Sequence, residues 1–196
     1  LFGDKHMGLW GASDSDESKP KNLTTAEKKE VFANASGWVR EAGSALTGND
    51  NTSADPEVLV AIGGLAVSIG AADITEIEFV TTAFDKSEGG NIDMLVRFNE
   101  PVDVTGTPQF LITNNTSSSR NITANYLSGT GTNELTFRKT IAAANAATNA
   151  NDVLKVVANP VSLNSGTIKD AGTNTASTIT SAVAIGTAAG TLTVAA

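Results

Sequence analysis

Apolar and polar residues alternate most regularly within residues 92–113, which read IDMLVRFNEPVDVTGTPQFLIT. Every second position from 92 to 98 is apolar, and the positions between them are mostly polar: the apolar residues are Ile92, Met94, Val96 and Phe98. A period of two predicts a strand with one face on a core and one face in water. Pro101 lacks a backbone donor, so it predicts a strand end or an edge strand at that point.

Short apolar segments follow at intervals along the rest of the chain, separated by turns rich in Gly, Asn and Ser. The sequence Gly106-Thr107-Pro108 predicts one such turn, after which residues 110–112 read as a buried strand. Further strands are predicted around residues 74–79, 122–126, 135–137, 154–157 and 163–168, and residues 183–194 are predicted to close the chain as a hairpin or an exposed edge. Many short strands of this kind predict a β-sandwich of two sheets.

The front of the chain has a different pattern. Thr24 and Glu27 form a Thr-x-x-Glu capping box, which predicts a short helix over residues 23–33. Residues 37–40 and 57–62 read as two strands, and the small, Gly-bearing stretch 66–72 is the predicted boundary. The sequence therefore predicts two domains: an extended arm with a small α+β anchoring module over residues 1–72, and a β-sandwich over residues 73–196.

The first 21 residues are rich in Gly, Ser and Asp, but they carry several large apolar side chains. A segment this polar buries too little area to fold alone, so one interpretation is a disordered end. The other is an arm whose Leu9 and Trp10 fill a pocket on a neighbouring subunit. Buried aromatic residues are the usual energetic centres of interfaces. The predicted interface residues are apolar residues early in the sequence that lie outside any predicted core, namely Phe2, Leu9, Trp10 and Trp38.

Composition excludes several classes of function. The net charge of −8 argues against nucleic-acid binding, and no apolar run is long enough to cross a membrane. Cysteine is absent and His6 is the single histidine, so the sequence predicts no enzyme, no cofactor and no metal site. Five carboxylates lie near predicted strand ends and are candidate calcium ligands, but the sequence contains no DxDxDG-like loop: Asp85, Glu88, Asp93, Glu100 and Asp170.

Six asparagines begin an Asn-x-Ser/Thr triplet. In a chain so rich in Asn and Thr such triplets arise by chance, and the side chains are predicted to serve turns, with glycosylation as the alternative.

Three blocks in the second half resemble the bacterial immunoglobulin-like repeats of large surface and secreted proteins. They read FNEPVDVTGTPQFLIT, ITANYLSGTGTNELTF and ANPVSLNSGTIKDAGTN, and they occur in the order typical of that family. The resemblance covers about residues 79–174 and implies an immunoglobulin-like β-sandwich. The chain departs from the family at residues 138–151, where an acidic, Gly-bearing turn is usual, so a cation site carried by that turn is not implied here.

The front half resembles a module that recurs at the start of structural proteins of marine tailed phages. The matching blocks read SDESKPKNLTTAEKKEVFANASGWVRE and PEVLVAIGGLA, within residues 10–65. Asn22 stands where that module often has an aromatic residue. The resemblance implies a place in a virion.

Together these patterns lead us to expect a capsid decoration protein on the virion surface, with the major capsid protein or other virion proteins as partners. The chain could also form a homo-oligomer on the particle, and the sandwich could make weak contacts with host surfaces. We expect residues 1–72 to bind empty particles, residues 73–196 to fold without binding, and Trp10→Ala to weaken attachment. The alternatives are a neck, tail or fibre component, or a fragment of a bacterial surface adhesin.

Overall fold

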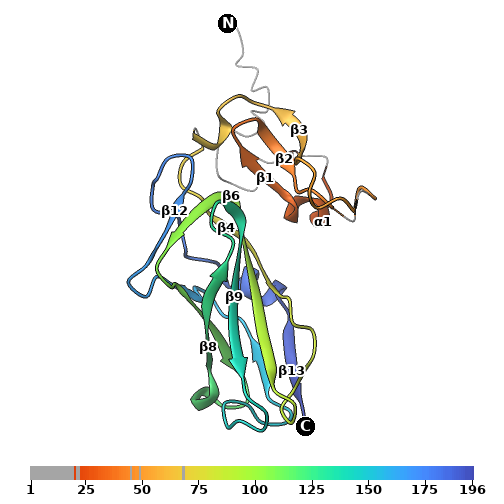
Figure 1. Cartoon of the computed structure of the whole chain (residues 1–196), viewed down its shortest axis with the longest axis vertical. Helices are drawn as coiled ribbons and strands as arrows, with labels where there is room; N and C mark the ends of the chain where they lie inside the picture. Colours follow the sequence, from red (N-terminus) through yellow and green to blue (C-terminus); the bar gives the residue numbers. More distant parts are fainter. Residues whose placement is uncertain (1–19, 21–22, 45, 49, 68) are drawn as a thin grey trace, which may run out of the picture. The chain divides into compact units, whose positions relative to one another are not determined.

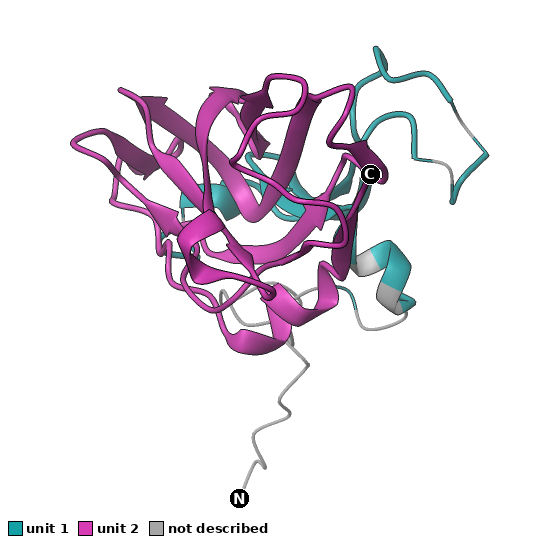
Figure 2. Cartoon of the chain, turned by 90° about the horizontal axis from the view of Figure 1, so that it is seen from below, with its two compact units in different colours: residues 1–71 teal, residues 72–196 magenta. Residues whose placement is uncertain are grey.

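The computed structural model describes residue 20 and residues 23–44, 46–48, 50–67 and 69–196. The described chain is mainly β, which confirms the expectation at this level. It divides into two compact units, residues 1–71 (unit 1) and residues 72–196 (unit 2), coloured separately in Figure 2. The boundary predicted from the sequence lies after residue 72.

Unit 1 contains a short helix and a small antiparallel sheet. The helix α1 (Thr25–Lys29) begins at a complete capping box, in which the backbone N–H of Glu27 donates to the Thr24 hydroxyl at 3.2 Å. In return, the Thr24 N–H donates to the Glu27 carboxylate at 2.8 Å. The capping box is confirmed, but the helix is shorter than predicted, because Val31 and Phe32 lie in a strand. Branched and aromatic residues favour a pleated strand over a helix end.

The sheet of unit 1 has the order β1-β2-β3 and is followed by a short 3-10 turn. Its elements are β1 (Val31–Asn34), β2 (Gly37–Arg40), β3 (Glu57–Ala61) and η2 (Leu65–Val67). Trp38 is fully buried in a small core with four other apolar residues: Val31, Ala33, Leu65 and Ile69. The two strands predicted in this part of the chain therefore pair with each other and form one side of that core.

Unit 2 is built on a ten-stranded sheet that curls on itself (Figure 1). The strand order is β12-β6-β9-β8-β7-β10-β13-β5, with β4 also paired to β6 and β11 also paired to β7. The elements are β4 (Ile74–Phe79), β5 (Phe84–Asp85), β6 (Gly90–Thr105), β7 (Gln109–Asn114), η3 (Ser118–Arg120), β8 (Ile122–Ser128), β9 (Thr132–Ile141), β10 (Val153–Lys155), β11 (Val161–Ser162), β12 (Thr167–Asp170), α2 (Val183–Ala188) and β13 (Thr191–Ala195).

The longest strand, β6, carries the alternating pattern from which the sheet was predicted. Ile92, Met94, Val96 and Phe98 are all at most 1% exposed, so the predicted core face is confirmed. The sequence predicted a strand end or an edge strand at Pro101. Instead, β6 continues through Pro101 to Thr105. The ladder to β9 is irregular between Arg97 and Val102, and beyond that point β6 pairs with β12. An irregular stretch of ladder accommodates a residue without an N–H.

The last segment of the chain differs from the prediction. Val183 and Ile185 lie in the helix α2, and only residues 191–195 form a strand. This strand, β13, lies between β10 and β5, antiparallel to the first and parallel to the second. It is therefore an interior strand of the sheet, and its inward residues Leu192 and Val194 belong to the main core.

Candidate functional site

The predicted interface residues fall into two groups in the structure. Phe2, Leu9 and Trp10 lie outside the described residues. Trp38 is 0% exposed and belongs to the core of unit 1, which corrects the expectation that no regular core claims it. Its neighbours across the sheet are Ala33 on β1 and Val60 on β3, and these strands enclose it from both sides. The Trp38 ring is therefore not available on the surface of unit 1.

Other apolar side chains do reach the described surface of unit 1. Leu46, Val58 and Val67 are 49%, 50% and 58% exposed. Val58 lies on β3, one of the two edge strands of the small sheet. The sequence did not single these residues out, because an isolated Val or Leu in a short apolar run looks the same whether the fold buries it or exposes it. Among the described residues of unit 1, these are the exposed large apolar side chains, and a partner can contact them directly.

The five carboxylates considered as calcium ligands are mostly separated. Asp85 accepts hydrogen bonds from the N–H and hydroxyl of Ser87, both at 2.7 Å, which hold its pKa below the usual range. Asp93 is paired with Arg138. Glu88 lines an open hollow with Asp85 near β5. Among the five, the structure brings Glu100 and Asp170 to neighbouring strands, β6 and β12, where each is 1% exposed.

Within the described ranges, no group of three or more His, Cys, Asp or Glu side chains is placed to hold a metal ion. His6 lies outside these ranges. Among the described helices, none has the length and apolar character that a membrane span requires.

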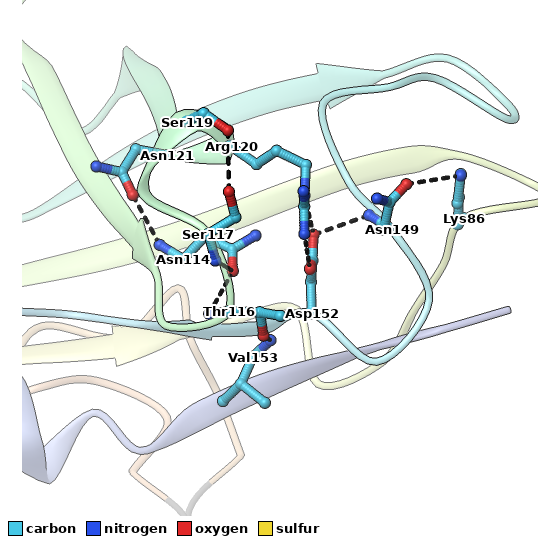
Figure 3. A network of polar contacts seen from close by, with 10 residues as sticks. All are labelled: Lys86, Asn114, Thr116, Ser117, Ser119, Arg120, Asn121, Asn149, Asp152 and Val153. Carbon is cyan, nitrogen blue, oxygen red and sulfur yellow. Dashed lines mark hydrogen bonds and ion pairs between the residues drawn. The ribbon is translucent and has the colours of Figure 1, made fainter.

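A network of polar contacts joins the loop before β10 to the turn after β7 (Figure 3). Arg120 donates two hydrogen bonds to Asp152, from Nε at 2.8 Å and from Nη2 at 2.6 Å. The N–H of Asn149 donates to the same carboxylate at 2.8 Å. Asp152 is fully buried, and the hydrogen bonds from Arg120 lower its pKa to about 2. A carboxylate so firmly ionised and paired is a poor proton acceptor, so the network is suited to fixing these loops.

Asparagine side chains organise several turns, as predicted. The Asn114 side chain accepts hydrogen bonds from the N–H groups of Thr116 and Ser117, at 2.8 and 3.1 Å. Asn34 and Asn51 each accept one from the residue two positions later, at 2.8 and 3.1 Å, and Asn121 accepts one from the N–H of Asn114 at 2.9 Å. The turn role is confirmed for these four residues, while Asn22 lies outside the described chain.

A charged cluster on the outward face of β4, β6 and β9 was not predicted from the sequence. Arg97 contacts Glu76 at 2.8 Å, Glu78 at 3.1 Å and Glu134 at 2.6 Å. These residues come from three strands that are distant in sequence, so only the register of the sheet reveals the cluster. It ties the strands together on the solvent side and leaves an excess of negative charge there.

No protein-family model, curated protein or solved structure matches this chain in comparisons with known proteins.

Proposed function

We propose that the chain is a structural protein of a phage virion, a capsid decoration protein that attaches through unit 1 and presents unit 2. The observation that carries the proposal is the resemblance of residues 10–65 to the front module of phage structural proteins. Two blocks of that resemblance, Gly-Trp-Val and Glu-Val-Leu-Val-Ala, lie apart in the sequence. In the structure they form the adjacent, paired strands β2 and β3. The two blocks that carry the resemblance are therefore neighbours within one folded unit.

Unit 2 is, in this proposal, an immunoglobulin-like sandwich. Its curled, mostly antiparallel sheet of short strands supports this assignment, as does the resemblance of residues 79–174. Aromatic contacts hold the core, with the ring centroids of Phe110 and Phe137 5.7 Å apart and those of Tyr126 and Phe137 6.1 Å apart. A module with its own packed core suits display in solvent.

Attachment would use the exposed apolar residues of unit 1, together with the arm before it. Leu46, Val58 and Val67 supply small apolar contacts, which gain affinity from water exclusion at an interface. Each contact is weak by itself. A symmetric shell repeats the site many times, so multivalent attachment of an oligomer would be far stronger than a single contact.

Val58→Asp in the full chain tests the attachment surface. We expect it to weaken binding to particles that lack the protein by about tenfold or more, since a charge on an apolar contact is left without a partner. Val80→Asp is the matched control, because Val80 is 51% exposed, against 50% for Val58, but lies in unit 2. Binding would be measured by co-sedimentation with the particles, and equal losses in the two variants would contradict attachment through unit 1.

Copy number separates decoration from the alternative of a neck, tail or fibre component. Quantitative gel staining of purified particles should give hundreds of copies for a shell decoration protein and a few to a few dozen for the alternative. If the protein cements the shell, particles lacking it should also melt at a lower temperature than complete ones. The resemblance of unit 2 to repeats of surface proteins favours an adhesin fragment as the remaining candidate, which predicts binding to cells and absence from particles.

A further inference from the structure

An open hollow of unit 2 lies where the segment around β5, the start of β6 and the end of β13 meet. Its volume is about 520 Å³, within the range of about 300–1,000 Å³ that is usual for pockets holding small ligands. The hollow therefore has the size of a ligand site, and the chemistry of its lining decides which ligand fits. Six lining residues carry that chemistry: Phe84, Asp85, Glu88, Gly90, Asn91 and Thr193.

Pairing of strands that are distant in sequence brings these residues together. β13 lies parallel to β5, with Val194 opposite Phe84. Leu192 and Val194 belong to the main core, so Thr193 between them points outward, where it lines the hollow. Asn91 is likewise exposed, at the start of β6. The sheet thus sets two hydrogen-bonding side chains from different strands around one hollow.

The floor of the hollow is apolar. Phe84 belongs to the main core and is 5% exposed, so a small part of it reaches the hollow. Gly90 has no side chain to cover that part, since a Cβ added there would lie 4.0 Å from Cε2 of Phe84. The φ of Gly90 is +138°, which residues with a Cβ rarely adopt, so the backbone keeps this position bare. A small apolar floor suits a ligand that has C–H groups on one face.

Two polar side chains around this floor are held in place by other residues of the chain. The Asp85 carboxylate accepts two hydrogen bonds from Ser87, which hold its pKa below the usual range and keep it ionised. The side-chain oxygen of Asn91 accepts a hydrogen bond from the Thr140 hydroxyl at 2.7 Å, so its amide nitrogen is left to donate to a ligand. Side chains that are already oriented lose less freedom on binding.

Two further side chains complete the hydrogen-bonding groups of the hollow. Glu88 and Thr193 are exposed, so a ligand can reach them. The hollow therefore offers two carboxylates as acceptors, one amide donor and one hydroxyl that can do both. This combination matches a polyol, because each of its hydroxyl groups can donate and accept, and a hydrogen bond from a hydroxyl to a carboxylate is strong.

Charge narrows the choice of ligand. Asp85 and Glu88 repel an anion, so an acidic sugar is disfavoured. Lys86, between them in sequence, is directed to Asn149, to which it donates a hydrogen bond at 3.0 Å. A cationic group would satisfy the carboxylates but would leave the Asn91 amide without an acceptor. A neutral polyol uses all of these groups.

We propose that this hollow binds one ring of a neutral saccharide. Asp85 and Glu88 accept hydrogen bonds from its hydroxyl groups, Asn91 donates one, and Thr193 adds a further bond from β13. The C–H face of the ring packs over Phe84. The inference concerns unit 2 alone and does not depend on a role in a virion.

Nuclear magnetic resonance titration of the isotope-labelled full chain tests the site. The probes are glucose, galactose, mannose and N-acetylglucosamine, with glucuronic acid as the anionic comparison. A ligand of about a dozen non-hydrogen atoms implies a Kd on the order of millimolar. At least one neutral sugar should produce saturable shifts confined to backbone amides around the hollow, such as those of Gly90 and Thr193. Glucuronic acid should bind at least several-fold more weakly than that sugar.

Thr193→Val keeps the branched shape of the side chain and removes its hydroxyl, so we expect the Kd to rise several-fold. Thr191→Val is the matched control, because Thr191 is exposed on the same face of β13 without lining the hollow, and its Kd should not change. Asn91→Asp keeps an acceptor for Thr140 but replaces the amide donor with a third negative charge. It should raise the Kd at least tenfold, while unchanged resonances of the core show that the variant is folded.

Three results would overturn the site. The first is that none of the four neutral sugars shifts the amides of the hollow. The second is that glucuronic acid binds as tightly as the best neutral sugar, and the third is that Thr191→Val weakens binding as much as Thr193→Val. The N-acetyl amide of lysine is titrated in parallel. If it shifts these amides and no sugar does, the hollow takes a cationic group and the saccharide assignment is wrong.

Discussion

At the level of single residues, unit 2 handles its buried charges in two ways. Asp152 is neutralised by a side chain, because Arg120 forms two hydrogen bonds to its carboxylate. Asp170 is equally buried, but only its Oδ1 accepts a hydrogen bond, from the N–H of Thr173, and its Oδ2 has no hydrogen-bond partner among the described residues. The paired carboxylate of Asp152 therefore predicts how the stability of unit 2 responds to acid.

Asp152 should make stability fall in acid. Its pKa is lowered from 3.8 to about 2 in the folded chain, so its contribution is fully present above the unfolded pKa and is lost as pH falls through the folded pKa. The loss is on the order of 2 kcal/mol, spread between about pH 5 and pH 1. Urea unfolding at a series of pH values should show a steeper acid slope for the unaltered chain than for Asp152→Asn. Parallel slopes would mean that the pair does not form.

Single residues also mark the limit of reading the sequence. The capping box of Thr24 and the turn roles of the asparagines are local, and both could be predicted. The burial of Trp38 could not be predicted, because the local sequence of a tryptophan beside a glycine is the same in a core and at an interface. Its burial depends on β1 and β3, which its own neighbours do not specify. The position of Glu100 and Asp170 on neighbouring strands likewise depends on the pairing of segments distant in sequence.

At the level of elements, local periodicity predicted strands well and their partners poorly. The alternation in β6 identified its core face, because that pattern follows from the chain alone. The helix over residues 23–33 was predicted too long and residues 183–188 were predicted extended, since tertiary pairing overrides weak local preferences. No pattern in the local sequence indicated that β13 lies between β10 and β5.

Gly37 is the element-scale position most sensitive to change. Its φ is +134°, and an added Cβ would lie 2.0 Å from the carbonyl oxygen of Val60 on β3. Gly37→Ala should destabilise unit 1 by about 1–3 kcal/mol from backbone strain alone, with the clash adding to it. In a Trp10→Phe background, Trp38 fluorescence would report the unfolding. Gly63→Ala, where an added Cβ meets nothing within 4 Å, should be nearly neutral, and equal effects would contradict the β2–β3 pairing.

At the level of the whole molecule, the described chain has two separate hydrophobic cores of unequal size. The core of unit 1 centres on Trp38, and the larger core of unit 2 contains Phe110 and Phe137. Burial of apolar area is the main source of stability, so the smaller core should hold its unit less firmly. The two units are therefore expected to unfold as separate cooperative blocks.

Phe137→Ala should separate these blocks. Truncation of a buried Phe costs about 3–5 kcal/mol, so the unit 2 transition should move to lower temperature while the unit 1 transition, followed by Trp38 fluorescence in a Trp10→Phe background, stays in place. Leu127→Ala serves as the control, since Leu127 is 48% exposed and should change little. A single transition that shifts as a whole would show that the units unfold together.

The position of β13 also has a consequence for how unit 2 folds. Its hydrogen bonds join β10 to β5, so a strand from the end of the unit must reach one from near its beginning. Contacts between distant segments form slowly, because the intervening chain must be ordered first. Until β13 docks, β10 and β5 each keep an open edge that another chain can pair with. The slowest step in assembling this sheet is thus also the period in which neighbouring chains compete most effectively for its edges.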